Sequence, residues 1–314
     1  MIVQRAREWL ANSVAFPGVA KCGILSPKFL AGEGFIAVLL SLLLPLFLGR
    51  TSAAQTPPTP SHDSYEVQRA LAAELNAAQD LMHPMRYRLR KSTPRLTSIK
   101  DIVETKDGAV ARLLSINDST PSDADRQKDD ARLDALLADP TRQHKRKQSE
   151  QDDTGRALKV LRALPRAFIY HYAGSVPNGA TTLDRFTFSP NPHFSSPDLE
   201  TQVLTELTGE LTVDPVHERV VRLEGHLQHD VDFGWGILAR LNKGGWIVIE
   251  QANVGADQWR IVRFQMVMNG RVLIKTRSFD TVEEETQFTP VPVGMSYQQA
   301  IQMLRPAGAA ASGK

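Results

Sequence analysis

Residues 221–233, VRLEGHLQHDVDF, decide the fold class, because apolar and polar residues alternate throughout this stretch. Successive side chains of a β-strand point to opposite faces of a sheet, so the alternation puts one set on a dry face and the other in solvent. The dry set is Val221, Leu223, Gly225, Leu227, His229, Val231 and Phe233. We therefore predict one long strand over 221–233, in a sheet with one buried face.

The residues that follow predict antiparallel neighbours for this strand. Gly244-Gly245 precedes an apolar run over 246–250, which a turn separates from a second run over 259–268. Asn269-Gly270 is a two-residue hairpin signal, since both residue types tolerate the positive φ angles that tight turns need. It predicts a hairpin that leads into 271–279. Short turns of this kind connect strands that are adjacent and antiparallel.

Upstream, helical and strand patterns alternate. Apolar residues every three or four positions from Ser64 predict an amphipathic helix that ends before Pro84. Leucines at helical spacing predict helices within an insertion over about 121–165. Proline cannot donate to a strand ladder, so Ser189-Pro190-Asn191-Pro192 is expected to leave the sheet. Further strands are predicted at 85–91, 99–105, 109–116, 168–172 and 185–188.

The strand predicted over 259–268 carries apolar residues on both faces. A sheet with one solvated face would not need this, so helices, a sheet that curls upon itself, or an apolar ligand must cover the second face. Methionine has a flexible thioether that adapts to irregular apolar guests. We therefore name as candidate ligand-binding residues the apolar set on one side of this strand, which is Val262, Phe264, Met266 and Met268.

The N-terminal region has the order of an export signal. An apolar run at 35–49 follows four basic residues and precedes Ser52-Ala53-Ala54. The run is shorter than the roughly 20 residues that span a bilayer, and it contains Pro45. We predict a signal peptide over 1–54 that is cleaved after Ala54, with an uncleaved anchor as the alternative. Residues 55–63 then form a solvated linker, and the location is periplasmic or secreted.

Composition limits the possible partners. The chain has 314 residues, 42% of them hydrophobic, and a net charge of +2. This is the composition of a globular protein without a field of one sign, so nucleic acid is not an expected partner. A basic cluster lies at 142–147, and acidic residues follow it at once. It is either a solvated helix face or a contact with an anionic membrane surface. The oligomeric state is left open.

Three polar residues of the first stretch resemble a metal-binding set. His226, Asp230 and Asp232 share one side of the predicted strand, but this spacing spreads them over about 20 Å, too far for one strand to close a zinc site. We expect a polar outer face and no metal. His171 and His193 are either proton shuttles or hydrogen-bonded parts of the fold. No motif for a catalytic nucleophile, phosphate loop or dinucleotide was found, so we name no catalytic residue.

Several short segments carry a resemblance to a known family. They are the hairpin around Asp107-Gly108, Phe188-Ser189-Pro190-Asn191-Pro192, the stretch 209–223 with Val213-Asp214, and Phe233-Gly234-Trp235-Gly236 followed by Lys243-Gly244-Gly245. With the leader and the meander, the layout of 64–292 resembles the bacterial periplasmic lipoprotein-carrier superfamily, and more closely an uncharacterised group of related secreted proteins.

This resemblance implies an α+β fold with a curved antiparallel β-sheet, an open half-barrel with helices covering the concave face. It also implies an apolar cavity for acyl chains and no cofactor. The half-barrel domain would comprise 64–292 with the helical insertion at about 121–165, and 293–314 would form a short helix and a disordered tail.

The predicted function is an exported envelope protein that binds or carries an apolar ligand, such as a lipid or the acyl chain of a lipoprotein. One alternative is an envelope sensor or assembly partner, and another is an enzyme with an unrecognised site. A carrier needs an enclosed apolar cavity, a sensor needs a partner surface, and an enzyme needs convergent polar groups in a cleft.

Overall fold

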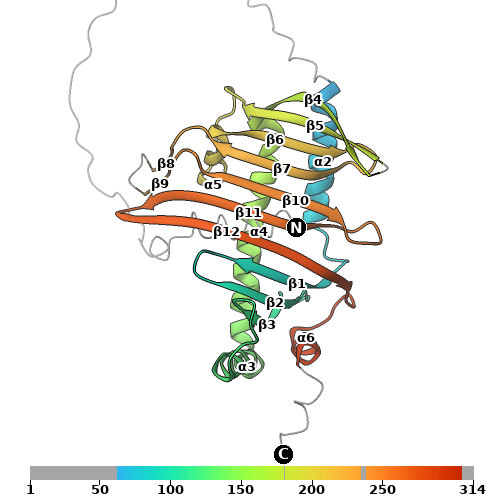
Figure 1. Ribbon diagram of the computed structural model, residues 1–314, viewed down its shortest axis with the longest axis vertical. Coiled ribbons are helices and arrows are strands. Elements are labelled where there is room, and N and C mark those ends of the chain that lie inside the picture. Colours follow the sequence, from blue (N-terminus) through green and yellow to red (C-terminus); the bar gives the residue numbers. More distant parts are fainter. Residues whose placement is uncertain (1–61, 180, 235–237, 306–314) are drawn as a thin grey trace, which may run out of the picture.

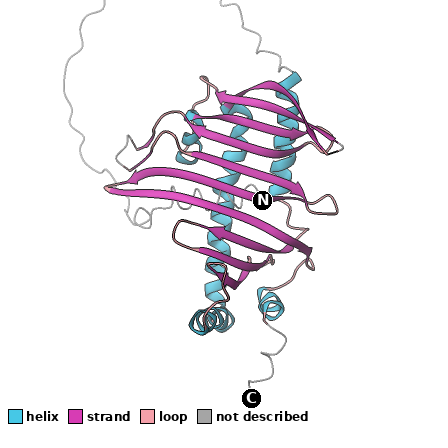
Figure 2. Ribbon diagram, in the orientation of Figure 1, coloured by secondary structure: helices cyan, strands magenta, loops and turns pink. Residues whose placement is uncertain are grey.

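The computed structural model describes residues 62–305 except 180 and 235–237. Its centre is a twelve-stranded antiparallel sheet with the main strand order β3-β2-β1-β12-β11-β10-β7-β6-β5-β4. The sheet remains open, and its long helices lie behind it in Figures 1 and 2. This confirms the predicted α+β class. The predicted signal peptide lies outside the described residues.

The helices are α2 (His62–Ala78), α3 (Asp123–Ala138), α4 (Pro140–Ala167), α5 (Leu199–Gln202) and α6 (Tyr297–Leu304), with a 3-10 helix η2 (Val203–Glu206). The strands are β1 (Met85–Ser92), β2 (Thr97–Val103), β3 (Val110–Ile116), β4 (Phe168–Asn178), β5 (Thr181–Pro190), β6 (Leu207–Asp214), β7 (Arg219–Leu227), β8 (Val231–Phe233), β9 (Ala239–Leu241), β10 (Trp246–Asn253), β11 (Trp259–Val272) and β12 (Lys275–Pro290).

The order of the strands in space differs from their order in the chain at two places. β1 pairs with β12, with Met85 opposite Pro290, so the N-terminal hairpins join the last strand. β10 pairs with β7, with Ile249 opposite Leu223, so β8 and β9 are left beside the end of β11. The sheet is therefore a set of hairpins joined through pairs that are distant in sequence.

Helix α4 is the longest helix and runs across the strands (Figure 1). Asp139 accepts a hydrogen bond from the backbone N–H of Thr141, and Pro140 occupies the first turn, where its missing donor costs nothing. In its C-terminal half, Ala157, Leu161 and Leu164 recur on one face and are buried in the main core. α2 adds Val67, Ala70 and Leu71 to the same core.

The N-terminal half of α4 is attached by polar contacts. Gln143 Nε2 donates to the carbonyl oxygen of Asp107 at 2.7 Å, and Arg146 Nη2 donates to that of Ala109 at 3.2 Å. Glu150 Oε2 accepts from the backbone N–H of Ala109 at 3.1 Å. The 142–147 cluster is therefore not a purely solvated face, because Arg146 is directed into the fold.

The strand predicted over 221–233 is divided into β7 and β8. Residues 228–230 interrupt it, and Gln228 donates its backbone N–H to the carbonyl of Glu206 at 3.0 Å. β8 then pairs with β9 instead of continuing beside β10. After the break the alternation resumes in phase, because Val231 and Phe233 are buried.

The dry face predicted for 221–233 was wrong at His229 and Val221. His229 is exposed in the break, and a bulge opposite Val213 buries Val220 in place of Val221.

The hairpin predicted at Asn269-Gly270 was wrong. β11 continues through both residues, and the turn lies at Leu273-Ile274, since Val272 pairs with Lys275. Gly270 has a different role, because a Cβ atom there would lie 2.3 Å from the carbonyl oxygen of Arg240. The glycine allows β9 to approach β11.

Ser189 and Pro190 were expected outside the sheet, but both remain paired with β4, opposite Ile169 and Phe168. The pairing of β5 with β6 ends at Phe188, so the missing donor of Pro190 faces no partner on that side. The loop begins only at Asn191.

The two edge strands of the main sheet, β3 and β4, differ in what lies against their free backbone groups. At β3, Asp129 of α3 accepts the backbone N–H of Leu113 at 3.1 Å, and Arg132 donates to the carbonyl of Ala111. At β4, a β-bulge shifts the register between Tyr172 and Ser175.

Among the described residues, no helix is long and apolar enough to cross a membrane.

Candidate apolar ligand site

An apolar cavity of about 80 Å³ lies between α4 and the helix-covered face of the sheet. Every residue that lines it is apolar: Ala157, Val160, Leu161, Leu164, Phe168, Phe188, Val203, Leu204, Leu207, Leu223, Ile247, Ile249 and Met268. The lining therefore suits hydrocarbon and offers no side-chain charge to a guest.

Three parts of the chain position this lining. Leu161 and Leu164 lie on the inner face of α4, and Leu204 comes from η2. Phe168 and Phe188 belong to paired strands, and their rings pack with centroids 4.6 Å apart. Strands β7, β10 and β11 supply the remaining wall through Leu223, Ile247, Ile249 and Met268.

Leu223 shows that the cavity is not sealed. It lies on β7, an interior strand flanked by β6 and β10, and it packs against the main core. Its cross-strand partners Leu211 and Ile249 are buried, whereas Leu223 itself is only partly buried. Solvent therefore reaches the cavity wall in the middle of the helix-covered face.

One row of residues crosses the sheet from apolar to charged. Ile249 pairs with Phe264, Phe264 pairs with Glu283, and Glu283 pairs with Lys91. The Lys91 ammonium lies 2.9 Å from the Glu283 carboxylate, which is only 3% exposed. Directly opposite side chains in a sheet lie about 5 Å apart, so the buried Glu283 carboxylate lies two strands, or about 10 Å, from Ile249 in the cavity wall, and its partner Lys91 is half-buried.

Three of the four predicted ligand-binding residues share a buried side of β11. Phe264, Met266 and Met268 are 2%, 3% and 1% exposed and belong to the main core. Met268 lines the cavity, whereas Phe264 and Met266 belong to the surrounding core. The ligand-binding role of these residues stays a prediction.

Val262, the fourth predicted ligand-binding residue, does not share the buried side of β11 with Phe264, Met266 and Met268. A β-bulge shifts the register between β10 and β11, because Glu250 pairs with Arg263 and the next residue, Gln251, pairs with Ile261. The extra residue reverses the alternation, so Ile261 joins the core at 0% exposed and Val262 is displaced from it. Strict alternation along β11 could not reveal the bulge.

Comparisons with known proteins give little further guidance. No family model matches the chain, and no curated protein matches it. A solved structure described as "Crystal structure of putative outer membrane lipoprotein-sorting protein domain from Vibrio parahaemolyticus" is similar, with 10% sequence identity and a TM-score of 0.26. The match covers 71% of this chain and 93% of that chain.

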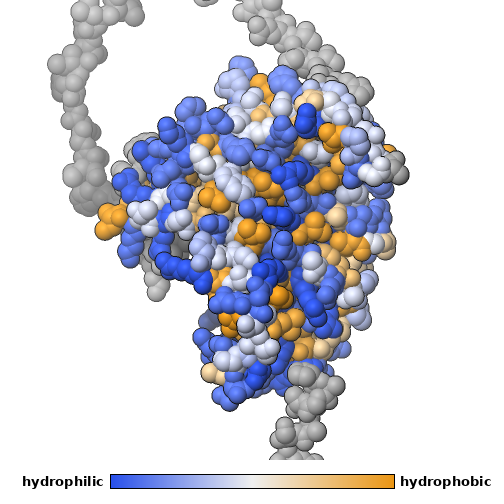
Figure 3. All heavy atoms as spheres, in the orientation of Figure 1, coloured by the Kyte–Doolittle hydropathy of each residue, from blue (hydrophilic) through white to orange (hydrophobic). Residues whose placement is uncertain are grey.

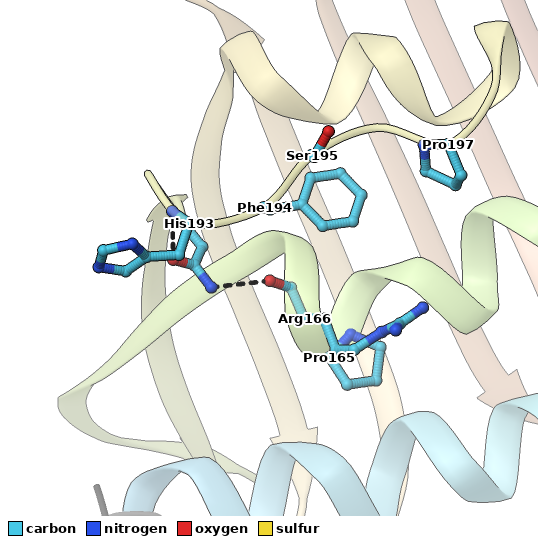
Figure 4. A pocket seen from close by; sticks show the side chains of 7 residues that line it. Pro165, Arg166, His193, Phe194, Ser195 and Pro197 are labelled. Atoms are coloured by element: carbon cyan, nitrogen blue, oxygen red, sulfur yellow. Dashed lines mark hydrogen bonds between the residues drawn. The ribbon is translucent and has the colours of Figure 1, made fainter. Parts of the chain in front are cut away.

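A second concavity, of about 540 Å³, lies where the 191–197 loop meets the end of α4 (Figure 4). Asn191 Nδ2 donates to the carbonyl of Arg166 at 2.9 Å, and Asn191 Oδ1 accepts the backbone N–H of His193 at 3.0 Å. These bonds fix the loop. Figure 4 shows the His193 imidazole directed away from Arg166 and Ser195, so the polar side chains diverge.

The predicted polar set on the outer face separates into ion pairs. Glu224 pairs with Arg222 and His226, and the hydrogen bond from Arg222, helped by that from His226, lowers the pKa of the Glu224 carboxyl. Asp230 and Asp232 instead pair with Arg240. Within the described part of the chain, no three His, Cys, Asp or Glu residues form a group that could hold a metal ion.

Proposed function

We propose that this protein binds the hydrocarbon part of a lipid, or of a lipid-modified protein, between α4 and the sheet. The observation that carries the proposal is the cavity whose entire lining is apolar and whose wall at Leu223 is reached by solvent. A sealed core would leave neither a void nor a partly exposed leucine on an interior strand. The leader-like sequence at 1–54 supports an envelope location.

The cavity must widen to accept an acyl chain. Its volume of about 80 Å³ is below the range of roughly 300–1,000 Å³ typical of ligand pockets. The C-terminal half of α4 faces the sheet through Ala157, Leu161 and Leu164, and a hydrocarbon guest can replace the contacts of such side chains at little net cost. The polar contacts of Gln143 and Arg146 hold the other half. The C-terminal end of α4 is also held, because Asn191 donates to the carbonyls of Arg166 and Ala167. We infer that the cavity widens by rearrangement of the apolar side chains between these two attachments.

The ligand should be amphipathic. The row from Ile249 through Phe264 ends at the Glu283–Lys91 ion pair, and the Lys91 side chain is 32% exposed. This ammonium is paired with Glu283 and lies three strands from Ile249 in the cavity wall, where solvent reaches it. It suits an acidic or polar group at the far end of a hydrocarbon tail. Free fatty acid is therefore a better first probe than a neutral alkane.

Two measurements test the proposal. Mass spectrometry of an organic extract of the purified protein should detect a co-purified lipid, and a fluorescent fatty acid should bind with saturable affinity. Leu223→Trp should lower this affinity at least tenfold, because the indole fills the void beside a position with room to accept it. Leu89→Trp is the matched control, since Leu89 is also partly buried but packs against a separate cluster around Tyr87. A protein that carries no lipid and binds no probe would refute the proposed function.

A further inference from the structure

The tip of the β11–β12 hairpin exposes two adjacent aliphatic residues. Leu273 and Ile274 form the whole turn and are 54% and 93% exposed. The hairpin projects at the left margin of Figure 1, and hydrophobic atoms lie at the same margin in Figure 3. Exposed aliphatic side chains are unfavourable in water. Turns of this length normally carry Gly, Asn or Asp instead.

The backbone of the turn adds a second cost. Leu273 has a φ of 53°, in the left-handed region where a side chain with a Cβ atom is disfavoured. Glycine would relieve this strain and remove the exposed leucine at once. A leucine in this conformation therefore costs stability, which is consistent with a role outside folding.

Basic residues surround the aliphatic tip. Residues 271–277, RVLIKTR, contain three basic residues and no acidic one. Lys275 and Arg277 are exposed. Asp230 and Asp232, next to this hairpin, share the single Arg240, so this group carries one net negative charge against the three positive charges of 271–277. The tip is thus apolar at its end and cationic around its base.

We propose that the β11–β12 tip docks on the surface of an anionic lipid bilayer. Leu273 and Ile274 enter the boundary between headgroups and acyl chains, while Lys275 and Arg277 contact lipid phosphates. A protein partner would need no such combination of a small aliphatic end and a cationic base, whereas an anionic bilayer matches both. This inference does not depend on the apolar cavity.

A fluorescent label at the tip tests the proposal in the full chain. The single cysteine, Cys22, is changed to serine, and Ile274→Cys is labelled with an environment-sensitive fluorophore. Vesicles with phosphatidylglycerol should shift the emission to the blue, and quenchers within the bilayer should reduce it. Because the label reports its own surroundings, membrane binding through the N-terminal leader does not produce this signal.

The matched control carries the label at Val216→Cys. Val216 is also exposed, at 74%, and lies in a turn next to His217, which contacts Trp259 at the opposite end of β11. The emission of the label at position 216 should not shift when phosphatidylglycerol vesicles are added. Lys275→Gln with Arg277→Gln should weaken vesicle binding of the tip by roughly 25-fold, since each basic residue near an anionic surface contributes about a factor of five.

Three outcomes would overturn the proposal. The first is no emission shift of the label at position 274, and the second is an equal emission shift with phosphatidylcholine vesicles, which carry no net charge. The third is an emission shift without vesicles that grows with protein concentration. The last would assign the tip to contact between copies of the chain. Each can occur whether or not the protein binds a fatty acid, so failure here is distinguishable from failure of the proposed function.

Discussion

The Glu74 carboxylate on α2 accepts two hydrogen bonds from the Arg219 guanidinium on β7, at 2.8 and 3.0 Å. Glu74 also accepts the backbone N–H of Val220 at 3.1 Å and is only 2% exposed. This buried pair joins the first described helix to an interior strand of the sheet. Arg219 in turn lies over the ring of Trp259.

Replacing Glu74 with alanine should lower the free energy of unfolding by about 3–5 kcal/mol, because the largely buried Arg219 guanidinium and the buried Val220 N–H lose their partner. Denaturant titration of the purified variant measures this loss. Arg69→Ala is the matched control on the same helix, since Arg69 pairs with Glu218 at the surface and should cost less than about 1 kcal/mol. Equal losses in both variants would contradict the assigned role of Glu74.

Met266→Ala and Met268→Ala should have similar effects on stability and different effects on lipid binding. Both side chains are buried, so each truncation should cost about 2–5 kcal/mol. Only Met268 lines the cavity, and its truncation enlarges the void. Uptake of a fluorescent fatty acid should therefore change in the Met268 variant and stay near wild type in the Met266 variant. The reverse result would move the ligand site along β11.

Stability should fall in acid partly through Asp214. Burial by itself favours the neutral carboxyl, but hydrogen bonds from His217 and Val216 outweigh it and lower the pKa of Asp214 below its ordinary value of 3.8. A lowered pKa in the folded state stabilises the fold above the unfolded-state pKa and loses this contribution as the pH falls through the folded-state pKa. The loss therefore begins near pH 3.8 and is complete below the lowered value.

Asp214→Asn should reduce this acid-dependent loss, because an amide does not titrate. The variant should still fold, since the amide oxygen can accept the backbone N–H groups that now bind Asp214. Urea titrations from pH 6 down to pH 2 measure the dependence. A variant that follows the wild-type pH curve would show that Asp214 does not contribute.

Gly270→Ala should detach β9 from β11, because the new Cβ atom would lie 2.3 Å from the backbone carbonyl oxygen of Arg240. Hydrogen exchange at the amides of β8 and β9 should accelerate, while exchange in β7 stays slow. Gly244→Ala is the comparison, since space at that position is open and only its φ of 80° is unfavourable. Unchanged exchange in β9 would contradict this account.

The sequence predicted the elements better than their connections. Alternation and helical spacing located most helices and strands to within a few residues, since both depend on local side-chain direction. They did not predict that β1 pairs with β12, because this pairing depends on contacts between segments distant in the chain. The short turn at Gly244-Gly245 did predict that 246–250 lies antiparallel to 221–233, and β10 pairs with the β7 part of that stretch. The pattern also could not separate β7 from β8, since the alternation stays in phase across their break.

The positions of the predicted site residues agree with the cavity in part, while their ligand-binding role stays a prediction. Met268 was identified from its strand pattern, but Val262 was misplaced because a bulge adds one residue that a period of two cannot detect. The contribution of Leu161 and Leu164 to the cavity was missed, since their helical spacing indicates only a buried face and not what lies opposite. The exposed Leu273-Ile274 turn was hidden by the stronger turn signal of Asn269-Gly270.

The pairing of Met85 with Pro290 also sets the order in which the protein can fold. During synthesis, β1, β2 and β3 can form their own hairpins early, but they have no place in the sheet until β12 has left the ribosome. Pairing such distant segments makes completion of the open sheet slow, because the conformational entropy of the whole intervening chain is lost first. The nascent chain therefore remains incompletely folded until its last strand is made.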